Sequence, residues 1–296
     1  MDLAGDRNSR RLVAGDHALP VGGLPLLMGI VNVTPDSFAD GGLYLTPQAA
    51  IDHGMRLADE GADLLDLGAE STRPGARPVA AEEELARLLP VLRELRRRLT
   101  IPISVDTYKA AVARPAIAEG ASMINDISGL SFDPMMGNTV AASGAALCLM
   151  HTPAPPRTMQ QCANYGDVVR AVVSALAASV SRAEAAGIGR DRLLIDPGLG
   201  FGKTADHNWT LLRDLNALHA LGLPLLIGAS RKSFLGAALA QNRDGPALAE
   251  PLPVTERLEG SLAIALWCAL QRVAVLRVHD VDATAKVLKI AQKLTN

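Results

Sequence analysis

The chain has 296 residues, of which 49% are hydrophobic and 20% charged, enough to bury a large core in one domain or in two smaller ones. Its formal net charge of −2 provides no overall basic field that would draw the protein to nucleic acid or to an anionic membrane. The three cysteines are scattered and form no C-x-x-C, which excludes a disulfide framework and a cysteine zinc site.

The first residues of the chain, 1–22, are polar and glycine-rich and are predicted to form a loose or hairpin-like lead-in. The segment 1–11 is charged and lacks the apolar core of a signal peptide, and no apolar run in the chain reaches 18 residues. We therefore expect a soluble, cytoplasmic protein with neither a membrane nor a nucleic-acid partner.

The first strand and helix follow the lead-in. Residues 26–31 are apolar and predict a buried strand, and a loop over 34–42 comes next. Thr46 followed by Pro47 is a favoured pair at a helix N-terminus. We predict a helix from this point to Gly61, because a glycine just past the last helical residue is a common stop.

The succession of helix, glycine, small residue, apolar strand and polar strand end recurs along the chain, with later cases at Gly120 and Gly144. Units of this size require parallel strands joined by helical crossovers. The predicted strands cover 26–31, 63–67, 101–105, 121–125, 145–150, 193–195, 224–228 and 273–277.

Eight strands that alternate with helices over the whole chain predict an α/β protein. Its architecture is expected to be a single (β/α)₈ TIM barrel over residues 23–296, preceded by the lead-in 1–22. A doubly wound open sheet is the alternative, but no G-x-G-x-x-G follows the first strand to support it.

The segment 191–204 combines a buried apolar run, a carboxylate and a glycine-rich turn. Its strand stops at Asp196, and Pro197 with three glycines takes the chain out of the sheet at once. A carboxylate at this place is typical of a ligand-reading group and equally of a solvated turn residue, so both readings stay open. The segment also mimics a P-loop, but the first glycine of G-x-x-x-x-G-K-T would fall on Pro197, which excludes a Walker nucleotide site.

Barrel enzymes build their sites at the carboxyl ends of the strands, where this chain carries many polar side chains. Taken alone, Asp66 and Asp126 are expected to be structural, with Asp66 hydrogen-bonded to a neighbouring loop, and His151 is as well explained by capping its strand as by function. Together the set predicts a mouth that carries amide, carboxylate and cationic groups. The strand-end residues are Asn32, Asp66, Asp106, Asn125, Asp126, His151, Asp196, Ser230, Lys232, Arg277 and His279.

Such a mouth suits a flat, polar heterocycle. An aminopyrimidinone edge presents a ring N–H beside an exocyclic NH₂, and one carboxylate accepts from both. Asp196 or Asp106 would do this, with Asn125 reading a mixed donor–acceptor edge.

The cationic residues of the mouth suit an anionic tail on that heterocycle. Arg73, Arg277 and His279 would meet a diphosphate. The turn at Ser230 is predicted to open a helix whose N–H groups favour an anion.

Five segments, taken together and in their order along the chain, resemble dihydropteroate synthase. The resemblance extends over residues 24–292, and the set is far more specific than any one of its members. It implies a transferase of folate biosynthesis that joins 6-hydroxymethyl-7,8-dihydropterin diphosphate to p-aminobenzoate and releases diphosphate. The segments are NVTPDSF at 32–38, GAESTRPG at 68–75, DPGLGFG at 196–202, GASRKSFLG at 228–236 and RVHD at 277–280.

The resemblance also implies roles for the matching residues. The implied catalytic residues are Asp36, Arg73, Asp106 and Lys232. The implied pterin-binding residues are Asp106, Asn125, Met150, Asp196, Phe201, Gly228 and Lys232. The diphosphate would contact Asn32, Arg73, Arg277 and His279, and p-aminobenzoate, or a sulfonamide in its place, would border Phe38, Thr72, Pro74 and Ser230. Asn32 would also hold Mg²⁺, the implied cofactor, which shares its charge with the leaving diphosphate.

Two loops are long enough to fold over the mouth, namely 34–42 and 69–79. They carry Asp36 and Arg73, and we expect them to close as lids that exclude water. One departure from the family lies nearby, because the segment 152–154 is Thr-Pro-Ala where the family often has Met-Gln-Gly.

Two other functions are compatible with a pterin-binding barrel. A pterin-dependent methyltransferase would keep Asp106, Asn125 and Asp196 but has no evident use for Arg73. A catalytically silent paralogue would have lost the anion site, whose residues are all present. The synthase is favoured over both.

A homodimer is predicted through the last two helices, which carry an apolar face. The alternative, that this face only covers the barrel, stays open. The residues of the face are Leu262, Leu266, Leu270, Val287, Leu288 and Ile290.

Overall fold

The computed structural model describes residues 10–33, 46–241 and 250–295. The strands are β1 Arg11–Ala14, β2 His17–Pro20, β3 Leu26–Asn32, β4 Leu64–Gly68, β5 Ile103–Asp106, β6 Met123–Asp126, β7 Ala146–Met150, β8 Leu193–Asp196, β9 Leu226–Ile227 and β10 Val275–Val278. The α-helices are α1 Pro47–Asp59, α2 Ala81–Arg98, α3 Ala110–Ala118, α4 Met136–Ala141, α5 Val168–Ala185, α6 Ala205–Arg213, α7 Leu215–His219, α8 Ser233–Leu239, α9 Leu258–Leu270 and α10 Val281–Thr295. Short 3₁₀ helices are η2 Met159–Cys162, η3 Arg190–Arg192 and η4 Val254–Glu256.

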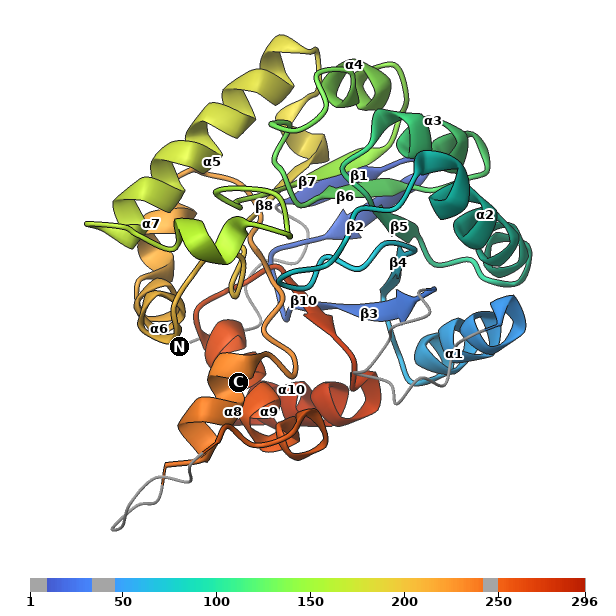
Figure 1. The fold of residues 1–296 in the computed structure, drawn as a ribbon. Coiled ribbons are helices and arrows are strands. Elements are labelled where there is room, and N and C mark those ends of the chain that lie inside the picture. The colour runs from blue at the N-terminus through green and yellow to red at the C-terminus, as the bar shows by residue number, and fades with distance from the viewer. Residues whose placement is uncertain (1–9, 34–45, 242–249, 296) are drawn as a thin grey trace.

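Strands β3 to β10 form one parallel sheet that curls into a barrel, with the helices around it (Figure 1). The order around the sheet is β8-β7-β6-β5-β4-β3-β10-β9. Between β8 and β9 the described residues contain only an isolated bridge, from Ile195 to Leu225. The predicted (β/α)₈ barrel is therefore confirmed, and its least hydrogen-bonded seam lies between β8 and β9.

Apolar side chains fill two layers on opposite faces of the strands, which is why the strands read as continuous apolar runs. The outer layer packs the sheet against the helices and includes Leu27, Leu65 and Leu147. The inner layer fills the barrel and includes Met28 and Leu64. Since side chains alternate along a strand, Asp66 follows Leu64 toward the interior, one step nearer the carboxyl end.

The hairpin of β1 and β2 closes the amino-terminal end of the barrel. Leu12 and Ala14 of β1 belong to the inner apolar layer and are almost completely buried. The backbone N–H of Gly15 at the hairpin turn donates to the carbonyl oxygen of Gly144, just before β7, at 2.9 Å. A closed floor leaves the carboxyl ends of the strands as the open end of the interior.

The local signals at helix ends behave largely as predicted. Thr46 caps α1, because its side chain accepts from the N–H of Ala49 at 3.2 Å. Gly61 and Gly120 both have a φ of +98°, as expected just past a helix end. Gly144 differs, because α4 already ends at the preceding turn and the left-handed glycines do not include it. None of the helices in the described ranges is both long and apolar enough to span a bilayer.

Candidate active site

The carboxyl ends of neighbouring strands collect polar side chains in the mouth of the barrel. The strand register sets Asp106 of β5 beside Asn125 of β6, and Met150 of β7 beside Asp196 of β8. Each of these four residues is less than a tenth exposed. The sheet therefore brings the predicted pterin-binding residues of four strands to one side of the mouth.

Arg277 on β10 reaches across the mouth to two carboxylates. Its Nε donates to Asp66 at 2.6 Å, and its Nη2 donates to Asp106 at 3.1 Å. The Nδ2 of Asn125 also donates to Asp66, at 3.1 Å. Asp66 thus bonds to side chains of other strands and not to a loop, which corrects the expectation made for it.

Three buried acceptor oxygens of this cluster have no partner within the described residues. They are one carboxylate oxygen each of Asp66 and Asp106 and the amide oxygen of Asn125. Buried acceptors are almost always paired in proteins, so a group of three marks a place that N–H donors of a ligand would satisfy. Burial raises the pKa of Asp106 to about 7, although Arg277 opposes the shift.

The glycine-rich turn after β8 folds against the chain that follows β7. Gly198 has a φ of +68°, and a Cβ there would lie 2.1 Å from the carbonyl oxygen of His151. The N–H of Gly198 donates to Asp196 at 2.7 Å, so the turn holds the carboxylate in place. At Gly202 a Cβ would meet the ring of Pro153 at 2.3 Å. The departure at 152–154 therefore lies against this turn.

Lys232 contacts the same turn from the opposite side of the β8–β9 seam. Its Nζ donates to the carbonyl oxygen of Leu199 and lies 4.7 Å from the centre of the Phe201 ring. Burial lowers the pKa of Lys232 to about 8, while Asp196 acts against that shift. Lys232, Asp196 and Phe201 are thus brought together, as predicted for a pterin pocket.

A strained turn presents Ser230 and Lys232. Arg231 between them has a φ of +57°, which is uncommon for a residue with a side chain. An ion pair of Arg231 with Asp280 holds this conformation, with Nε 3.0 Å from the carboxylate. Helix α8 begins only at Ser233, so the prediction that Ser230 opens a helix was wrong.

Ser230 instead contacts the end of β10. Its hydroxyl oxygen accepts from the N–H of His279 at 3.2 Å and lies 3.0 Å from the Nδ1 of the same residue. Burial, together with nearby cations that include Arg277 and Arg73, lowers the pKa of His279 to about 3. His279 is therefore a neutral hydrogen-bonding group at pH 7 and contributes no positive charge.

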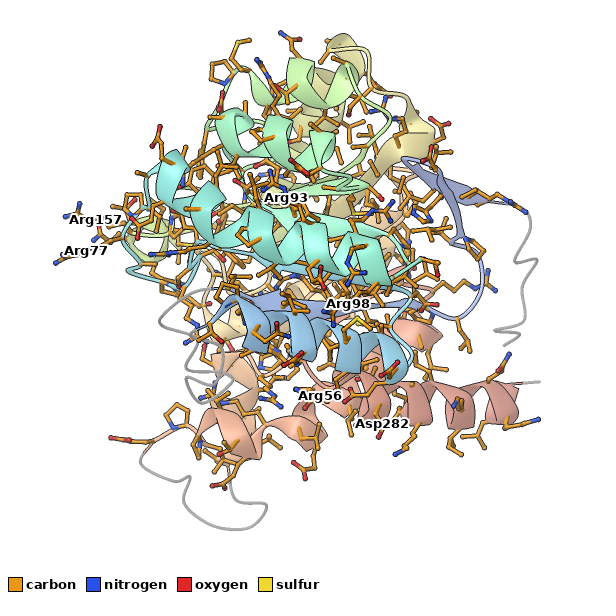
Figure 2. All side chains as sticks on the ribbon, turned by 90° about the vertical axis from the view of Figure 1, so that its right-hand side faces the viewer. Arg56, Arg77, Arg93, Arg98, Arg157 and Asp282 are labelled. Atoms are coloured by element: carbon orange, nitrogen blue, oxygen red, sulfur yellow. The ribbon has the colours of Figure 1, made fainter. Side chains whose placement is uncertain are left out.

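The loop 69–80 lies over the same end of the barrel and carries Arg73, whose side chain is exposed. The N–H of Gly75 in this loop donates to the carbonyl oxygen of Pro156, in the chain after β7, at 3.0 Å. Arg77 and Arg157 extend outward from this end of the molecule (Figure 2). Two loops of different origin thus give the rim a positive character.

The remaining predicted residues are distributed as follows. Asn32 ends β3 in register with Gly68, and Gly228 follows β9 beside the side chain of Arg277. Thr72 and Pro74 lie in the loop 69–80 next to Arg73. Asp36, Phe38 and the proposed lid 34–42 lie outside the described residues.

Asp126 has a structural role at the end of β6. Its carboxylate accepts from the N–H and hydroxyl of Ser128 and from the N–H of Leu130, at 2.7 to 2.8 Å. These bonds order the turn after the strand, which confirms the structural expectation for this residue.

Lys203 and Lys109 were not predicted to take part in a site. Lys203 is almost fully buried behind the glycine-rich turn and donates to the carbonyl oxygen of Phe201 at 3.0 Å. The sequence did contain a signal for Lys203, because it directly follows the glycine-rich turn that carries site residues. Lys109 lies under the loop 69–80, and no local sequence pattern predicts its partners, because they are far away in the sequence.

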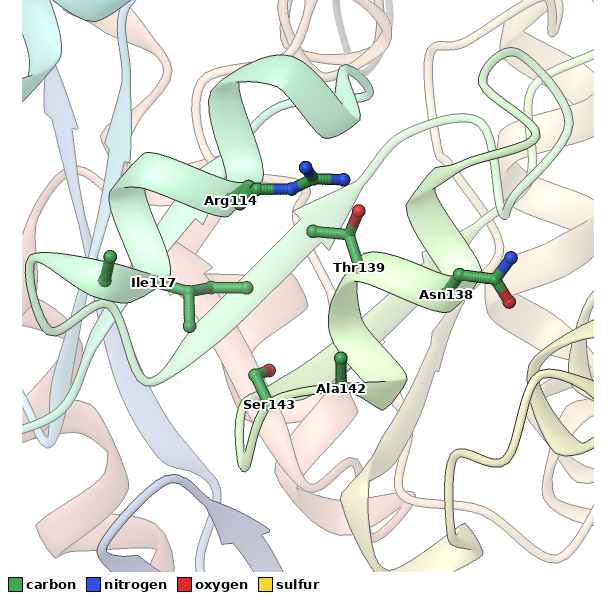
Figure 3. A pocket seen from close by; sticks show the side chains of 7 residues that line it. Arg114, Ile117, Asn138, Thr139, Ala142 and Ser143 are labelled. Carbon is green, nitrogen blue, oxygen red and sulfur yellow. The ribbon is translucent and has the colours of Figure 1, made fainter.

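A separate groove lies on the outside of the barrel between α3 and α4. Its volume is about 320 Å³, and Arg114 and the hydroxyl of Thr139 point toward one another across it (Figure 3). Its lining is mostly apolar and includes none of the predicted site residues. The groove is therefore distinct from the mouth.

Comparisons with known proteins agree with this geometry. Residues 28–279 match the model of a family described as pterin binding enzyme. The dihydropteroate synthase of Escherichia coli (strain K12) is 43% identical over 268 residues, which cover 90% of this chain and 91% of that protein. The chain belongs to the dihydropteroate synthase family.

Solved structures of synthases share the whole fold. A Yersinia pestis dihydropteroate synthase with a sulfonamide drug complex superposes with a TM-score of 0.88 at 40% identity, covering 96% of this chain and 98% of that one. The Xanthomonas albilineans synthase with 4-aminobenzoic acid gives a TM-score of 0.86 at 45% identity, covering 97% and 98%. The resemblance predicted from the five segments is confirmed, and with it a transferase of folate biosynthesis.

Proposed function

We propose that the mouth of this barrel joins 6-hydroxymethyl-7,8-dihydropterin diphosphate to p-aminobenzoate and releases diphosphate. The observation that carries the assignment is the group of buried, unpaired acceptors formed by Asp66, Asp106 and Asn125. An aminopyrimidinone offers N–H donors on one edge, and a site built to receive them rejects ligands that lack them. Membership of the synthase family supports the same substrate.

The pterin would lie between the strand ends and the glycine-rich turn. Asp106, Asn125 and Asp196 would accept or share its ring hydrogens, and Lys232 would donate from the other side of the seam. Met150, Phe201 and Gly228 would border the ring. The proximity of the Lys232 ammonium to both Asp196 and the Phe201 ring supports a flat polar ligand here.

The chemical demand of the reaction is to stabilise charge on the departing diphosphate. The guanidiniums of Arg277 and Arg73 lie near His279, and their charge helps to keep it neutral. We propose that the two guanidiniums stabilise the leaving group electrostatically, while His279 and Asn32 donate hydrogen bonds to it. No nucleophilic side chain is needed, because the pterin itself stabilises the cationic carbon.

The second substrate would enter over the loops. Thr72, Pro74 and Ser230, with Phe38 outside the described residues, would border p-aminobenzoate. The Xanthomonas albilineans relative was solved with 4-aminobenzoic acid, and the Yersinia pestis relative with a sulfonamide. We propose that sulfonamides compete for this position, and that the loops 34–42 and 69–79 close over it and exclude water.

The proposed Mg²⁺ would be held by one protein group, the amide oxygen of Asn32. The described residues contain no cluster of three His, Cys, Asp or Glu that would hold a metal alone. Mg²⁺ commonly keeps several waters and binds through few protein oxygens together with substrate phosphates, so this donor set fits an ion that arrives with the diphosphate. When bound there, it would neutralise part of the leaving-group charge.

The experiment for this function is product formation by the purified protein. Dihydropterin diphosphate, p-aminobenzoate and Mg²⁺ are supplied, and dihydropteroate is measured by mass spectrometry with and without a chelator. Product above a no-enzyme control, and its loss on chelation, are expected. Intact pterin binding without product would instead favour a silent paralogue or a methyltransferase.

We also propose a homodimer in the cytoplasm, built on α9 and α10. On these helices Trp267 is 39% exposed, Ile290 is 62% exposed and Leu294 is 80% exposed, so each leaves apolar surface that a second copy of the chain would cover. Leu288 packs in the core and does not belong to the surface predicted for it. Light scattering is expected to give twice the chain mass of 31.0 kDa, and a monomeric mass would contradict the dimer.

A further inference from the structure

The side chain of Lys109 lies beneath the loop 69–80 and contacts both of its ends. Its Nζ donates to the carboxylate of Glu70 at the start of the loop and to the carbonyl oxygen of Val79 at the end, the latter at 2.7 Å. The N–H of Val79 in turn donates to Glu70 at 3.3 Å. One ammonium and one carboxylate therefore draw the two ends of the loop together.

A second carboxylate binds the ammonium to helix α2, which packs outside the barrel. Glu84, in the first turn of α2, accepts from Lys109 Nζ at 2.6 Å. The side chains of Glu70 and Glu84 are only 5% and 1% exposed, and that of Lys109 is 17% exposed. Burial raises the pKa of Glu84, while the hydrogen bond from Lys109 lowers it. Charges held so far from water interact strongly, and removing one partner leaves the others uncompensated.

Further bonds join this group to the pterin side of the mouth. The hydroxyl of Tyr108 donates to Glu70 at 2.8 Å, next to Lys109 in the chain. Both residues follow directly on the end of β5, where Asp106 lies. The segment 106–109 therefore carries a pterin-binding carboxylate at one end and the loop anchor at the other.

We propose that Lys109 is a positioning residue for the transfer reaction. With Glu70 and Glu84 it forms an ionic clasp, which holds both ends of the loop 69–80 so that Thr72 and Arg73 stay above the pterin. The clasp leaves the middle of the loop free to close, while its ends keep a fixed distance from Asp106. This inference rests on the proposed roles of Thr72 and Arg73.

The test uses Lys109→Met, which keeps the length of the apolar stem and removes the charge. Lys109→Arg restores the charge, and Lys286→Met removes a lysine from an exposed pair with Asp282 on α10. Hydrogen exchange over 69–80 is measured on the substrate-free protein by mass spectrometry. The kinetic readouts are KM for p-aminobenzoate, kcat, and the Kd of 6-hydroxymethylpterin by calorimetry.

We expect Lys109→Met to speed exchange in the loop by about tenfold or more, since local opening sets the exchange of loop amides. KM for p-aminobenzoate is expected to rise about tenfold and kcat to fall, because small displacements of positioning groups are costly. The pterin Kd stays within about twofold, since none of its proposed binding residues lies in the loop 69–80. Lys109→Arg is expected to restore most of the slow exchange and of the wild-type kinetics, and Lys286→Met is expected to behave as the wild type.

Unchanged exchange over 69–80 in a folded Lys109→Met protein would overturn the clasp. Faster exchange with unchanged KM would overturn the positioning role, and it would place the fault in the assignment of Thr72 and Arg73. If Lys109→Met does not fold, Glu70→Gln gives the same comparison with the ammonium still paired to Glu84. A wild-type protein without product would contradict the proposed function and leave the exchange result intact.

Discussion

The Nζ of Lys203 lies 3.0 Å from the Nδ1 of His151, and both side chains are buried. Burial lowers the pKa of Lys203 to about 7 and that of His151 to about 3. The pair therefore joins the end of β7 to the glycine-rich turn after β8 by a bond whose imidazole is neutral at physiological pH. Because Lys203 also bonds to Phe201, it fixes one wall of the proposed pterin pocket.

Replacing Lys203 by methionine should destabilise the protein more at alkaline than at acidic pH. The loss of its hydrogen bonds leaves buried acceptors unpaired, at a cost of about 1–3 kcal/mol. The folded-state pKa of about 7 lies below the unfolded value near 10.4, so the unfolded chain binds the extra proton between these pH values. The free energy of unfolding of the wild type therefore rises with pH between these two pKa values, and that of the variant does not. Urea unfolding at pH 6 and pH 9 measures the difference, and an equal loss at both would contradict it.

Pterin affinity should increase between pH 6 and pH 8. The pKa of Asp106 is raised to about 7 in the free enzyme, and only its ionised form accepts hydrogens from the pterin with both oxygens. Calorimetry with 6-hydroxymethylpterin avoids the titration of the diphosphate. Asp106→Asn is expected to bind weakly, with little dependence on pH over this range. A pH profile as steep in Asp106→Asn as in the wild type would assign the dependence to another group.

Arg277→Met should disable catalysis and also destabilise the fold. Its removal leaves Asp66 and Asp106 without their cation in a buried place, which costs about 3–5 kcal/mol when one partner of such a group is lost. Arg277→Lys keeps the charge but cannot serve both carboxylates in the same geometry. We expect kcat/KM to fall at least about a hundredfold in Arg277→Met and less in Arg277→Lys. Steady-state kinetics with thermal unfolding separates the two effects, and a fully active Arg277→Met would remove the residue from the site.

Gly198→Ala should be much more harmful than Gly187→Ala. Both glycines have left-handed backbones, with φ of +68° and +93°, so both variants carry a similar backbone penalty. A Cβ at Gly198 would collide with the carbonyl oxygen of His151, whereas a Cβ at Gly187 would meet nothing within 4 Å. We expect about 1 kcal/mol of destabilisation at Gly187 and at least about 2 kcal/mol more at Gly198, with loss of pterin binding. Equal effects would show that the turn moves easily away from His151.

The barrel and the positions at its strand ends were readable from the sequence because they follow from periodic patterns. The apolar runs identified the strands, and the ends of those runs placed Asp106 and Asp196 at the mouth of the barrel. The N-cap at Thr46 was visible because its partner is three residues away. Strand ends and helix caps of this kind can be predicted from short-range spacing in the sequence.

The contacts that arrange the site join residues far apart in the chain, and local spacing does not reveal them. Arg277 and Asp66 are 211 positions apart, and Lys109 and Glu70 are 39 apart. The turn around Arg231 was predicted to start a helix, because the residue that holds its strained backbone, Asp280, lies far away in the sequence. Such pairings become visible only when the sheet has placed the strands side by side.

The sparsely bonded seam between β8 and β9 would make a bound pterin part of the barrel structure. Asp196 lies on one side of it and Lys232 on the other, so a pterin held by both would link the two strands where the described part of the chain has only one bridge. A ligand that binds only the closed seam stabilises it by mass action. Resistance of this region to proteases would then follow the cell's supply of the pterin substrate, and a cell short of that pterin would hold the enzyme in its most easily degraded form.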